Sequence, residues 1–215
     1  MSKIKLLLFL CLSSTRLFAY DFEVSIASIF RDEAPFLKEW IEFHRLIGVE
    51  HFYLYNHCSQ DHFKEVLNPY VQEGLVELFD WSEEATSRVH FRKIQSAALR
   101  DAAIRARGVS KWVAFIDADE YIFPVRDKTL PQFLASYEEY GAVSANWRVF
   151  GTSHIKHLKK DQLMIEQLLF RAEEDHAWND YVKSIVQVNF IDTTVDFENT
   201  HQFPLIEGKR NYWKD

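Results

Sequence analysis

Three carboxylates stand together near the middle of the chain, where an apolar segment ends. Trp112 to Ile116 is an unbroken apolar run of strand length, and Asp117, Asp119 and Glu120 follow it directly. A buried parallel strand has this pattern when its carboxyl end opens into a site. Because strand side chains alternate between faces, we expect Asp117 and Asp119 to point the same way and to offer oxygen donors to one divalent cation. Such a pair suits the binding of a diphosphate.

The alternative for an Asp-x-Asp pair is a solvated turn that follows a hydrophobic strand. Here apolar residues lie on both sides of the acids, at Phe115–Ile116 before them and at Tyr121–Phe123 after them. This context argues against an exposed loop tip. We therefore expect the acidic cluster to lie at a binding site.

The segments before these acids alternate between the strand period and the helix period. The expected order is a strand over 22–30, a helix over about 35–47, a strand over 50–56, a short helix that ends near 68, a strand over 75–79, a helix over 86–107 and the strand over 112–116. This alternation indicates a parallel sheet with right-handed crossovers, in which ligands bind outside the carboxyl ends of the strands.

Polar residues stand at the expected carboxyl end of each of these four strands. They are Asp32, Asn56, Asp80 and Asp117. Asp32 is also expected to cap the first helix, with Pro35 in its first turn. We expect these side chains to line the site together with Asp119.

The pattern becomes mixed in the second half of the chain. We expect a helix over 131–140, a strand over 143–147, an amphipathic segment over 163–170, and strands over 182–190 and near 194–197. The length of 215 residues and the lack of a boundary indicate one domain over 20–215. The predicted fold class is therefore α/β, with a mostly parallel central sheet, helices on both faces and a mixed carboxyl-terminal part.

The composition excludes several classes of protein. The net charge is -7 and the basic residues are scattered among acids, so the chain lacks the basic face of a nucleic-acid-binding protein. It contains neither Gly-x-Gly-x-x-Gly nor a P-loop sequence, so a dinucleotide fold and a P-loop are not supported. An anionic ligand would need a metal ion or local cations.

The amino terminus resembles an export signal. Lys3 and Lys5 precede an apolar run over 6–12, and Ala19 ends a short segment of the type that precedes cleavage. We expect residues 1–19 to be a signal peptide or a short anchor, and the protein to be exported or membrane-associated. A buried first strand is the remaining alternative for this segment.

Several spaced stretches together resemble glycosyltransferase family 92 and the neighbouring family-2-like transferases of the GT-A fold. The matching stretches are 31–56, Phe115–Tyr121, Trp147–His154 and Lys183–Val186. The resemblance implies a GT-A-type domain that moves a sugar from a nucleoside-diphosphate sugar to a glycan or glycoconjugate acceptor. It also implies inversion at the anomeric carbon and Mn2+, or Mg2+, on the diphosphate. Galactose from UDP-galactose is the donor that the family suggests.

The chain departs from the family pattern at two places. Asn56 stands in the turn after the second strand, where related sequences tend to carry an aspartate. In the acceptor half the expected Glu-Arg-Phe is Glu166-Gln167-Leu168, so only the carboxylate is retained. The resemblance therefore supports a uridine contact at Asn56 less strongly than it supports the acidic site.

The resemblance and the chemistry of transfer assign roles to several side chains. Asp119 is the expected metal ligand, and Asp117 binds the metal or the ribose. His201 is the expected third ligand, with a purely structural histidine as the alternative. Glu166 is the expected general base, because the apolar residues that follow it would bury it and raise its pKa. The acidic cluster 173–175, which consists of Glu173, Glu174 and Asp175, is the alternative source of the base.

Side chains at the ends of the first two strands are expected to bind the nucleotide, and two from the long helix to approach it from the side. The strand-end residues are Arg31, Asp32, Glu33 and Asn56, and the helix residues are Arg88 and Gln95. Lys209 and Arg210 either cover the departing diphosphate or form a solvated tail. Helix capping or surface ion pairs are the structural alternative for the nucleotide residues.

Two other classes of function compete with the transferase. One is a non-catalytic exported carbohydrate-binding protein on the same scaffold, which predicts loss of the acidic site. The other is a metal-dependent hydrolase of phosphate esters, which needs several His and Asp clusters for a two-metal site. The intact Asp117-Ala118-Asp119 sequence argues against the first, and the scarcity of such clusters argues against the second.

Overall fold

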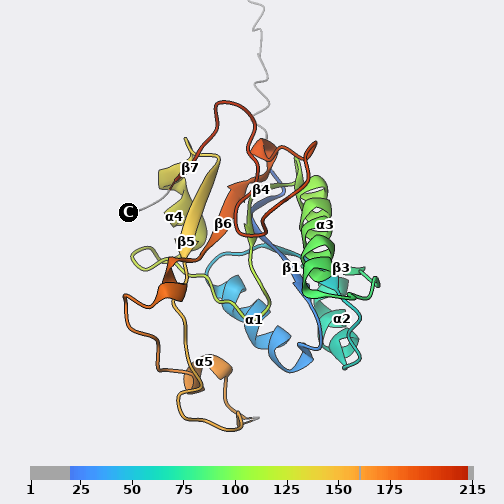
Figure 1. The fold of residues 1–215 in the computed structure, drawn as a ribbon, viewed down its shortest axis with the longest axis vertical. Helices are drawn as coiled ribbons and strands as arrows, with labels where there is room; N and C mark the ends of the chain where they lie inside the picture. Colours follow the sequence, from blue (N-terminus) through green and yellow to red (C-terminus); the bar gives the residue numbers. More distant parts are fainter. Residues whose placement is uncertain (1–19, 160, 213–215) are drawn as a thin grey trace, which may run out of the picture.

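A seven-stranded sheet with helices on both faces forms the centre of the molecule (Figure 1). The computed structural model describes residues 20–159 and 161–212. The strands are β1 (Phe22–Phe30), β2 (His51–Asn56), β3 (Val76–Asp80), β4 (Ser110–Phe115), β5 (Ala142–Asn146), β6 (Val182–Gln187) and β7 (Asn211–Tyr212). The helices are α1 (Ala34–Leu46), α2 (Phe63–Glu73), α3 (Arg88–Ala106), α4 (Leu130–Leu134) and α5 (Met164–Gln167). Their spatial order across the sheet is β3-β2-β1-β4-β6-β5-β7.

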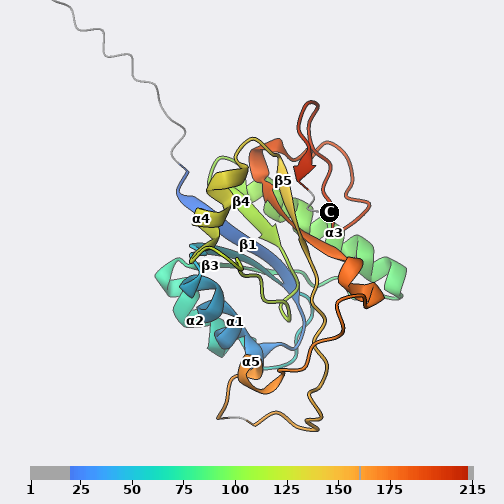
Figure 2. The same cartoon turned by 90° about the vertical axis from the view of Figure 1, so that its left-hand side faces the viewer.

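The first four strands are parallel and are joined by α1, α2 and α3. Side chains of α1, α2 and α4 pack on one face of the sheet, and the alanine-rich side of α3 packs on the other (Figure 2). Since parallel strands joined by crossovers end on the same edge, the residues after β1, β2, β3 and β4 meet there. The predicted α/β class and the first seven elements are confirmed.

The second half of the sheet contains both strand directions. Strand β6 is antiparallel to β4 and to β5, and its residue Ser184 lies opposite Phe115. The start of β6 therefore lies beside the carboxyl end of β4. This pairing brings Lys183 to the acidic stretch after β4, which the linear order of the sequence does not reveal.

Several elements of the second half differ from the prediction. The helix expected over 131–140 is only α4 followed by a 3-10 turn (Ala135–Tyr137), and the amphipathic segment holds only the single turn α5. Strand β6 stops at Gln187, whose partner is Trp112 of β4, and a 3-10 turn (Val188–Phe190) follows. The strand expected near 194–197 is wrong. There Asp192 accepts hydrogen bonds from both the amide and the hydroxyl of Thr194, which forms a turn instead.

The helices of the described residues include none that is both long and apolar enough to cross a membrane. The predicted signal or anchor over 1–19 lies outside the described residues.

Two side chains of α1 hold the backbone that follows the acidic stretch. Trp40 Nε1 donates to the carbonyl of Glu120 at 2.7 Å, and the amide of Ile122 donates to His44 Nε2 at 3.2 Å. His44 Nδ1 donates to the carbonyl of Trp40 at 2.7 Å. His44 must therefore be neutral, with its proton on Nδ1. Burial lowers the pKa of this imidazole to about 4.

His44 should make the stability of the protein depend on pH. Its folded pKa lies below its unfolded value of about 6.5, so its contribution is complete above pH 6.5 and is lost as the pH falls toward 4. The difference amounts to about 3 kcal/mol. Denaturant unfolding at pH 7 and pH 4.5 should show a smaller loss for His44→Gln than for the wild type. The exposed His157→Gln is the control, and equal losses in all three proteins would contradict the role of His44.

Candidate functional site

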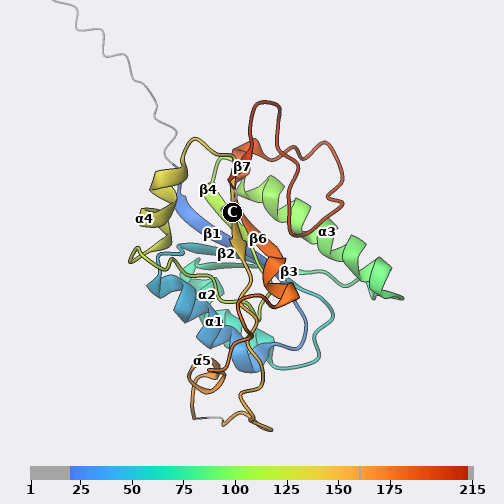
Figure 3. The same cartoon turned by 60° about the vertical axis from the view of Figure 1, so that its left-hand side comes forward.

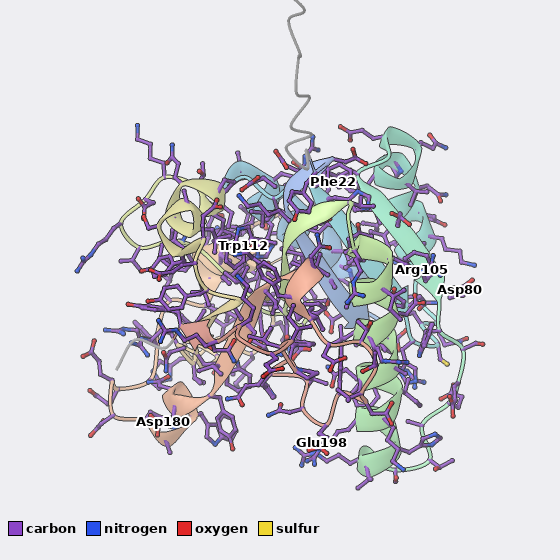
Figure 4. The ribbon with its side chains drawn as sticks, turned by 90° about the horizontal axis from the view of Figure 1, so that it is seen from above. Phe22, Asp80, Arg105, Trp112, Asp180 and Glu198 are labelled. Atoms are coloured by element: carbon purple, nitrogen blue, oxygen red, sulfur yellow. The ribbon has the colours of Figure 1, made fainter. Side chains whose placement is uncertain are left out.

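Most of the predicted site residues meet at the carboxyl edge of the parallel strands. Arg31, Asp32 and Glu33 follow β1, Asn56 ends β2, and Asp117 and Asp119 follow β4. Gln95 reaches the same place from α3, because its Nε2 donates to Asp117 Oδ1 at 3.1 Å. Figure 4 labels Asp80, which ends β3 on one side of the sheet, and Asp180, which precedes β6 on the other.

A buried lysine that sequence reasoning missed lies at the centre of this edge. Lys183 Nζ is 2.7 Å from Asp117 Oδ2 and 3.2 Å from Glu120 Oε2. Only 5% of Lys183 is exposed, so its ammonium depends on these two carboxylates for charge compensation. The signal in the sequence was a single charged residue inside the apolar strand Val182–Val186. Burial raises the pKa of Glu120, with a smaller opposing effect of Lys183.

The acids after β4 do not continue the strand, so the alternation argument for Asp117 and Asp119 is wrong. Strand β4 ends at Phe115, and the amide of Glu120 donates to the carbonyl of Asp117 at 3.1 Å to close a turn. The amide of Asp117 donates in return to Glu120 Oε2 at 2.8 Å. The two aspartates are nevertheless close enough to interact. Burial and the charge of Asp117 raise the pKa of Asp119.

Several carboxylates also lie around Glu33, which is close enough to Asp119 to interact with it. The pKa of Glu33 is raised by burial first, and then by Asp119, Asp61 and Asp32. Lys183 lies beside Asp117 and Glu120 and offsets their charge. At Glu33, by contrast, the charged groups that shift the pKa are all carboxylates. Hard oxygen donors with an excess of negative charge fit a divalent cation. Within residues 20–159 and 161–212, no three His, Cys, Asp or Glu side chains are arranged to hold a metal ion by themselves.

His201 lies near this edge, on the side of β6. Its Nδ1 donates to the carbonyl of Val182 at 2.9 Å, and its ring contacts Trp147 and Tyr181. Burial and the charge of Lys183 lower its pKa, so the imidazole is held neutral at physiological pH. A neutral imidazole whose Nδ1 donates to a carbonyl has the tautomer that a metal ligand requires.

The loops after β1 and β2 are joined by hydrogen bonds. Asp32 Oδ1 accepts from the amide of Gln60 at 2.6 Å, and the amide of Asp32 donates to Ser59 Oγ at 2.9 Å. Asn56 donates to Asp80 Oδ1 and accepts from the amide of Ser59, both at 3.0 Å. These bonds make Asn56 and Asp32 part of a fixed rim around the site.

Asp61, and not Asp32, caps helix α1. Its Oδ2 accepts from the amide of Ala34 at 2.7 Å, whereas Asp32 has a φ of 57° and turns away. The predicted cap at Asp32 is therefore wrong, because a residue from the next loop supplies the acceptor. Arg31 is exposed and pairs with Glu84 at 3.3 Å. Arg88 is exposed at the first residue of α3.

Glu166 is exposed, so the burial that favoured it as the base is wrong. Its Oε2 accepts from the amide of Leu163 at 3.2 Å and thus caps α5. Helix α5 lies in the excursion between β5 and β6, which extends beyond the sheet and returns to it (Figure 3). Glu39 of α1 holds this turn, because its carboxylate accepts from the amides of Met164 and Ile165 at 2.8 and 3.0 Å.

The acidic cluster 173–175 is held beside the end of β5 by the buried Asn179. Asn179 Nδ2 donates to the carbonyls of Glu173 and Glu174 at 2.8 and 3.3 Å, and its Oδ1 accepts from the amide of Val149 at 3.1 Å. This network places the backbone of the cluster near Trp147, at the site edge. Sequence reasoning did not single out Asn179.

Lys209 and Arg210 lie away from the candidate site. They precede β7, which pairs with the first residues of β5, whereas the site is at the other end of that strand. Lys209 Nζ lies 3.8 Å from the centre of the Phe190 ring, and the Arg210 guanidinium lies 5.6 Å from that of Tyr140. A role for these two residues at a departing diphosphate is not supported by this placement.

Comparison with known proteins places this arrangement in a family. The profile described as glycosyltransferase family 92 matches residues 20–211. The chain belongs to glycosyltransferase family 92. It is 30% identical over 194 residues to a family 92 protein of Ricinus communis, covering 87% of this chain and 32% of that protein. A galactan beta-1,4-galactosyltransferase of Arabidopsis thaliana is 29% identical over 126 residues, covering 56% of this chain and 24% of that protein.

This family 92 chain spans about a third of the length of the first curated relatives that it matches. Among solved structures it is similar to TarS 1-349 of S. aureus in complex with UDP, with a TM-score of 0.47 and 13% identity over 84% of this chain and 53% of that chain. It is also similar to glucosyl-3-phosphoglycerate synthase from Mycobacterium tuberculosis in complex with Mn2+ and UDP. There the TM-score is 0.35, with 14% identity over 57% of this chain and 43% of that chain.

Replacing Lys183 in this family 92 chain should destabilise the folded protein. Lys183→Met leaves two neighbouring carboxylates without their shared cation and should lower the free energy of unfolding by about 3 kcal/mol. Adding Glu120→Gln should recover part of this loss, because one of the two charges is then removed. Denaturant unfolding at pH 7 measures both, with the exposed Lys38→Met as control. A Lys183→Met protein as stable as the control would contradict the charge network.

Removing the charge of Glu39 should loosen α5. Bonds to an ionised acceptor are about twice as strong as neutral ones, so Glu39→Gln should speed amide exchange at Met164 and Ile165 about tenfold. Hydrogen exchange followed by mass spectrometry or NMR provides the measurement. Glu65→Gln, at an exposed position of α2, should leave these amides unchanged. Unaltered protection in Glu39→Gln would show that the excursion is held elsewhere.

Proposed function

We propose that this chain is the catalytic part of a metal-dependent glycosyltransferase, which moves a sugar from a nucleoside-diphosphate sugar to a glycan or glycoconjugate acceptor. The observation that carries the proposal is the acidic edge of the sheet, where Asp119 and Glu33 accumulate negative charge beside the Lys183 network. Membership of glycosyltransferase family 92 supports the reaction class. In this proposal the reaction inverts the configuration at the anomeric carbon.

Asp119, together with Asp117, would hold Mn2+ or Mg2+. His201 is the proposed third protein ligand and would have to move toward the two aspartates when the ion binds, because the three side chains are not gathered around one point without it. The ion supplies charge neutralisation for the leaving diphosphate. Lys183 fixes the position of Asp117 through an ion pair, in which the ammonium lies 2.7 Å from Asp117 Oδ2. Gln95 fixes the other oxygen of Asp117 from α3. The aspartate is thus oriented before any ligand arrives, which reduces the cost of binding.

The nucleotide is proposed to lie over the rim formed after β1 and β2. Arg31, Asp32 and Glu33 would face the base and ribose from the first strand, with Asn56 from the second. The hydrogen bonds of Asp32 and Asn56 within the rim support a positioning role for these two side chains. Arg88 would approach from the start of α3.

A carboxylate in the acceptor half is proposed to accept the proton of the acceptor hydroxyl. Glu166 and the cluster 173–175 remain the candidates. The position of Glu166 is fixed through α5 and Glu39, and that of the cluster through Asn179. Either arrangement would hold a base on a defined backbone.

UDP-galactose is the proposed donor, since a galactan beta-1,4-galactosyltransferase is among the relatives. Residues 1–19 are proposed to export the protein or to associate it with a membrane, facing a compartment that supplies nucleotide sugars. A non-catalytic carbohydrate-binding protein is the second candidate. The retained acidic edge disfavours it, because such a protein has no need to gather carboxylates there.

Titration of the full chain with UDP tests this proposal. UDP should bind in the micromolar range with Mn2+ present and much more weakly with a chelator, because the ion offsets repulsion between the carboxylates and the diphosphate. Asp119→Asn should weaken the metal-dependent binding at least about a hundredfold, since it removes a charged ligand. Calorimetry provides the affinities.

The matched control for this titration is Asp196→Asn, which changes an exposed aspartate on the turn after β6. It should bind UDP as the wild type does. A folded wild-type protein that fails to bind UDP with any divalent ion would overturn the transferase proposal and favour the carbohydrate-binding candidate.

A further inference from the structure

Three aromatic rings contact one another where β5 ends and β6 begins. The centres of Trp147 and Tyr181 are 5.5 Å apart, those of Trp147 and His201 are 5.9 Å apart, and those of Tyr181 and His201 are 6.3 Å apart. Trp178 precedes Tyr181 on the same segment. Trp178 is 58% exposed and Tyr181 is 53% exposed, so both present large ring surfaces to solvent.

This aromatic surface continues directly from the candidate site. Lys183 Nζ, which is 2.7 Å from Asp117, lies 5.9 Å from the centre of the Trp147 ring. The amide of Trp147 donates to the carbonyl of Tyr181 at 2.9 Å and extends the pairing of β5 with β6 by one step. A ligand that reaches Asp117 from this side must therefore pass Trp147 and Tyr181.

The backbone that carries the exposed rings is fixed. Residues 177–180 form a 3-10 turn, and the amide of Tyr181 donates to the carbonyl of Trp178 at 3.2 Å. Asn179, between the two rings in sequence, is only 3% exposed and bonds to the backbone on both sides of the excursion. Rings on such a backbone lose little conformational entropy when a ligand binds.

The chemistry of this surface favours a carbohydrate. A sugar ring has an apolar C–H face and a rim of hydroxyl groups, so it needs a flat apolar partner with polar neighbours. Trp and Tyr provide such amphipathic rings. The exposed Arg148, Glu173 and Asp180 lie in the same segments of the chain and can donate hydrogen bonds to hydroxyl groups or accept them. A protein or lipid partner would instead favour a continuous apolar patch.

We propose that Trp178 and Tyr181 form an acceptor subsite that holds a glycan chain by stacking against its sugar rings and directs its end toward Asp117. This proposal rests on the proposed transferase function and names the side from which the acceptor enters. The subsite recognises an oligosaccharide rather than a single sugar, because it offers two exposed rings, Trp178 and Tyr181, in addition to Trp147, which contacts Tyr181.

The full chain titrated with β-1,4-galactotetraose, in the presence of saturating UDP and Mn2+, tests this subsite. Saturation-transfer NMR or calorimetry should show binding to the wild type, and Trp178→Ala and Tyr181→Ala should each weaken it about tenfold. Trp178→Phe should retain most of the affinity, since it keeps a ring. Phe123→Ala, at a residue that is also 58% exposed but packs near Phe43 of α1, should have no effect.

Affinity for UDP separates failure of this subsite from failure of the transferase proposal. Each aromatic variant should bind UDP as the wild type does, because neither exposed ring is assigned to the nucleotide. Wild-type binding of UDP without binding of the tetrasaccharide, or equal tetrasaccharide binding by the Ala variants, would overturn the subsite alone. Loss of UDP binding in the wild type would overturn both proposals.

Discussion

The candidate site depends on one buried cation. Lys183 is almost completely enclosed, and burial of an unpaired ammonium would cost several kcal/mol, so the chain must bring carboxylates to it. Asp117 and Glu120 do so from a turn that directly follows β4, and only the antiparallel pairing of β6 with β4 allows the contact. The mixed direction of the sheet is thus coupled to the position of the acids. A purely parallel continuation would place the start of β6 at the opposite edge.

Helix α1 also holds the same acidic turn. Trp40 and His44 bond to the backbone at Glu120 and Ile122, while Lys183 engages the side chains. Backbone and side chains of the turn are therefore fixed by different elements. Glu39, on the same helix, bonds to α5 of the excursion. Helix α1 thus connects the donor side of the proposed site with its acceptor side through three residues that lie close together on one rigid element.

The sequence alone was enough to predict the helices and strands of the parallel half of the sheet. It was not enough to predict the contacts that assemble the site. Apolar periodicity and glycine stops located the elements from β1 to β4, because those signals are local. Lys183 was missed because its partners are decided by the pairing of strands distant in sequence. The cap from Asp61 was missed for the same reason, since a neighbouring loop supplies it. Glu166 was misjudged because apolar neighbours in sequence do not bury a side chain on an exposed turn.

The charges at this edge explain why a divalent ion belongs to the proposed reaction even though a lysine is already present. The ammonium of Lys183 is already engaged by two carboxylates, those of Asp117 and Glu120. Asp119 and Glu33 lie beside them, and the pKa of each is raised by burial first and by neighbouring carboxylates second. A diphosphate that approached these carboxylates alone would meet repulsion in a partly desolvated place, where charge interactions are strong. A cation bound by Asp119, as proposed, would reverse the sign of that interaction. The fixed lysine would then shape the site, and the exchangeable ion would make it able to receive an anion.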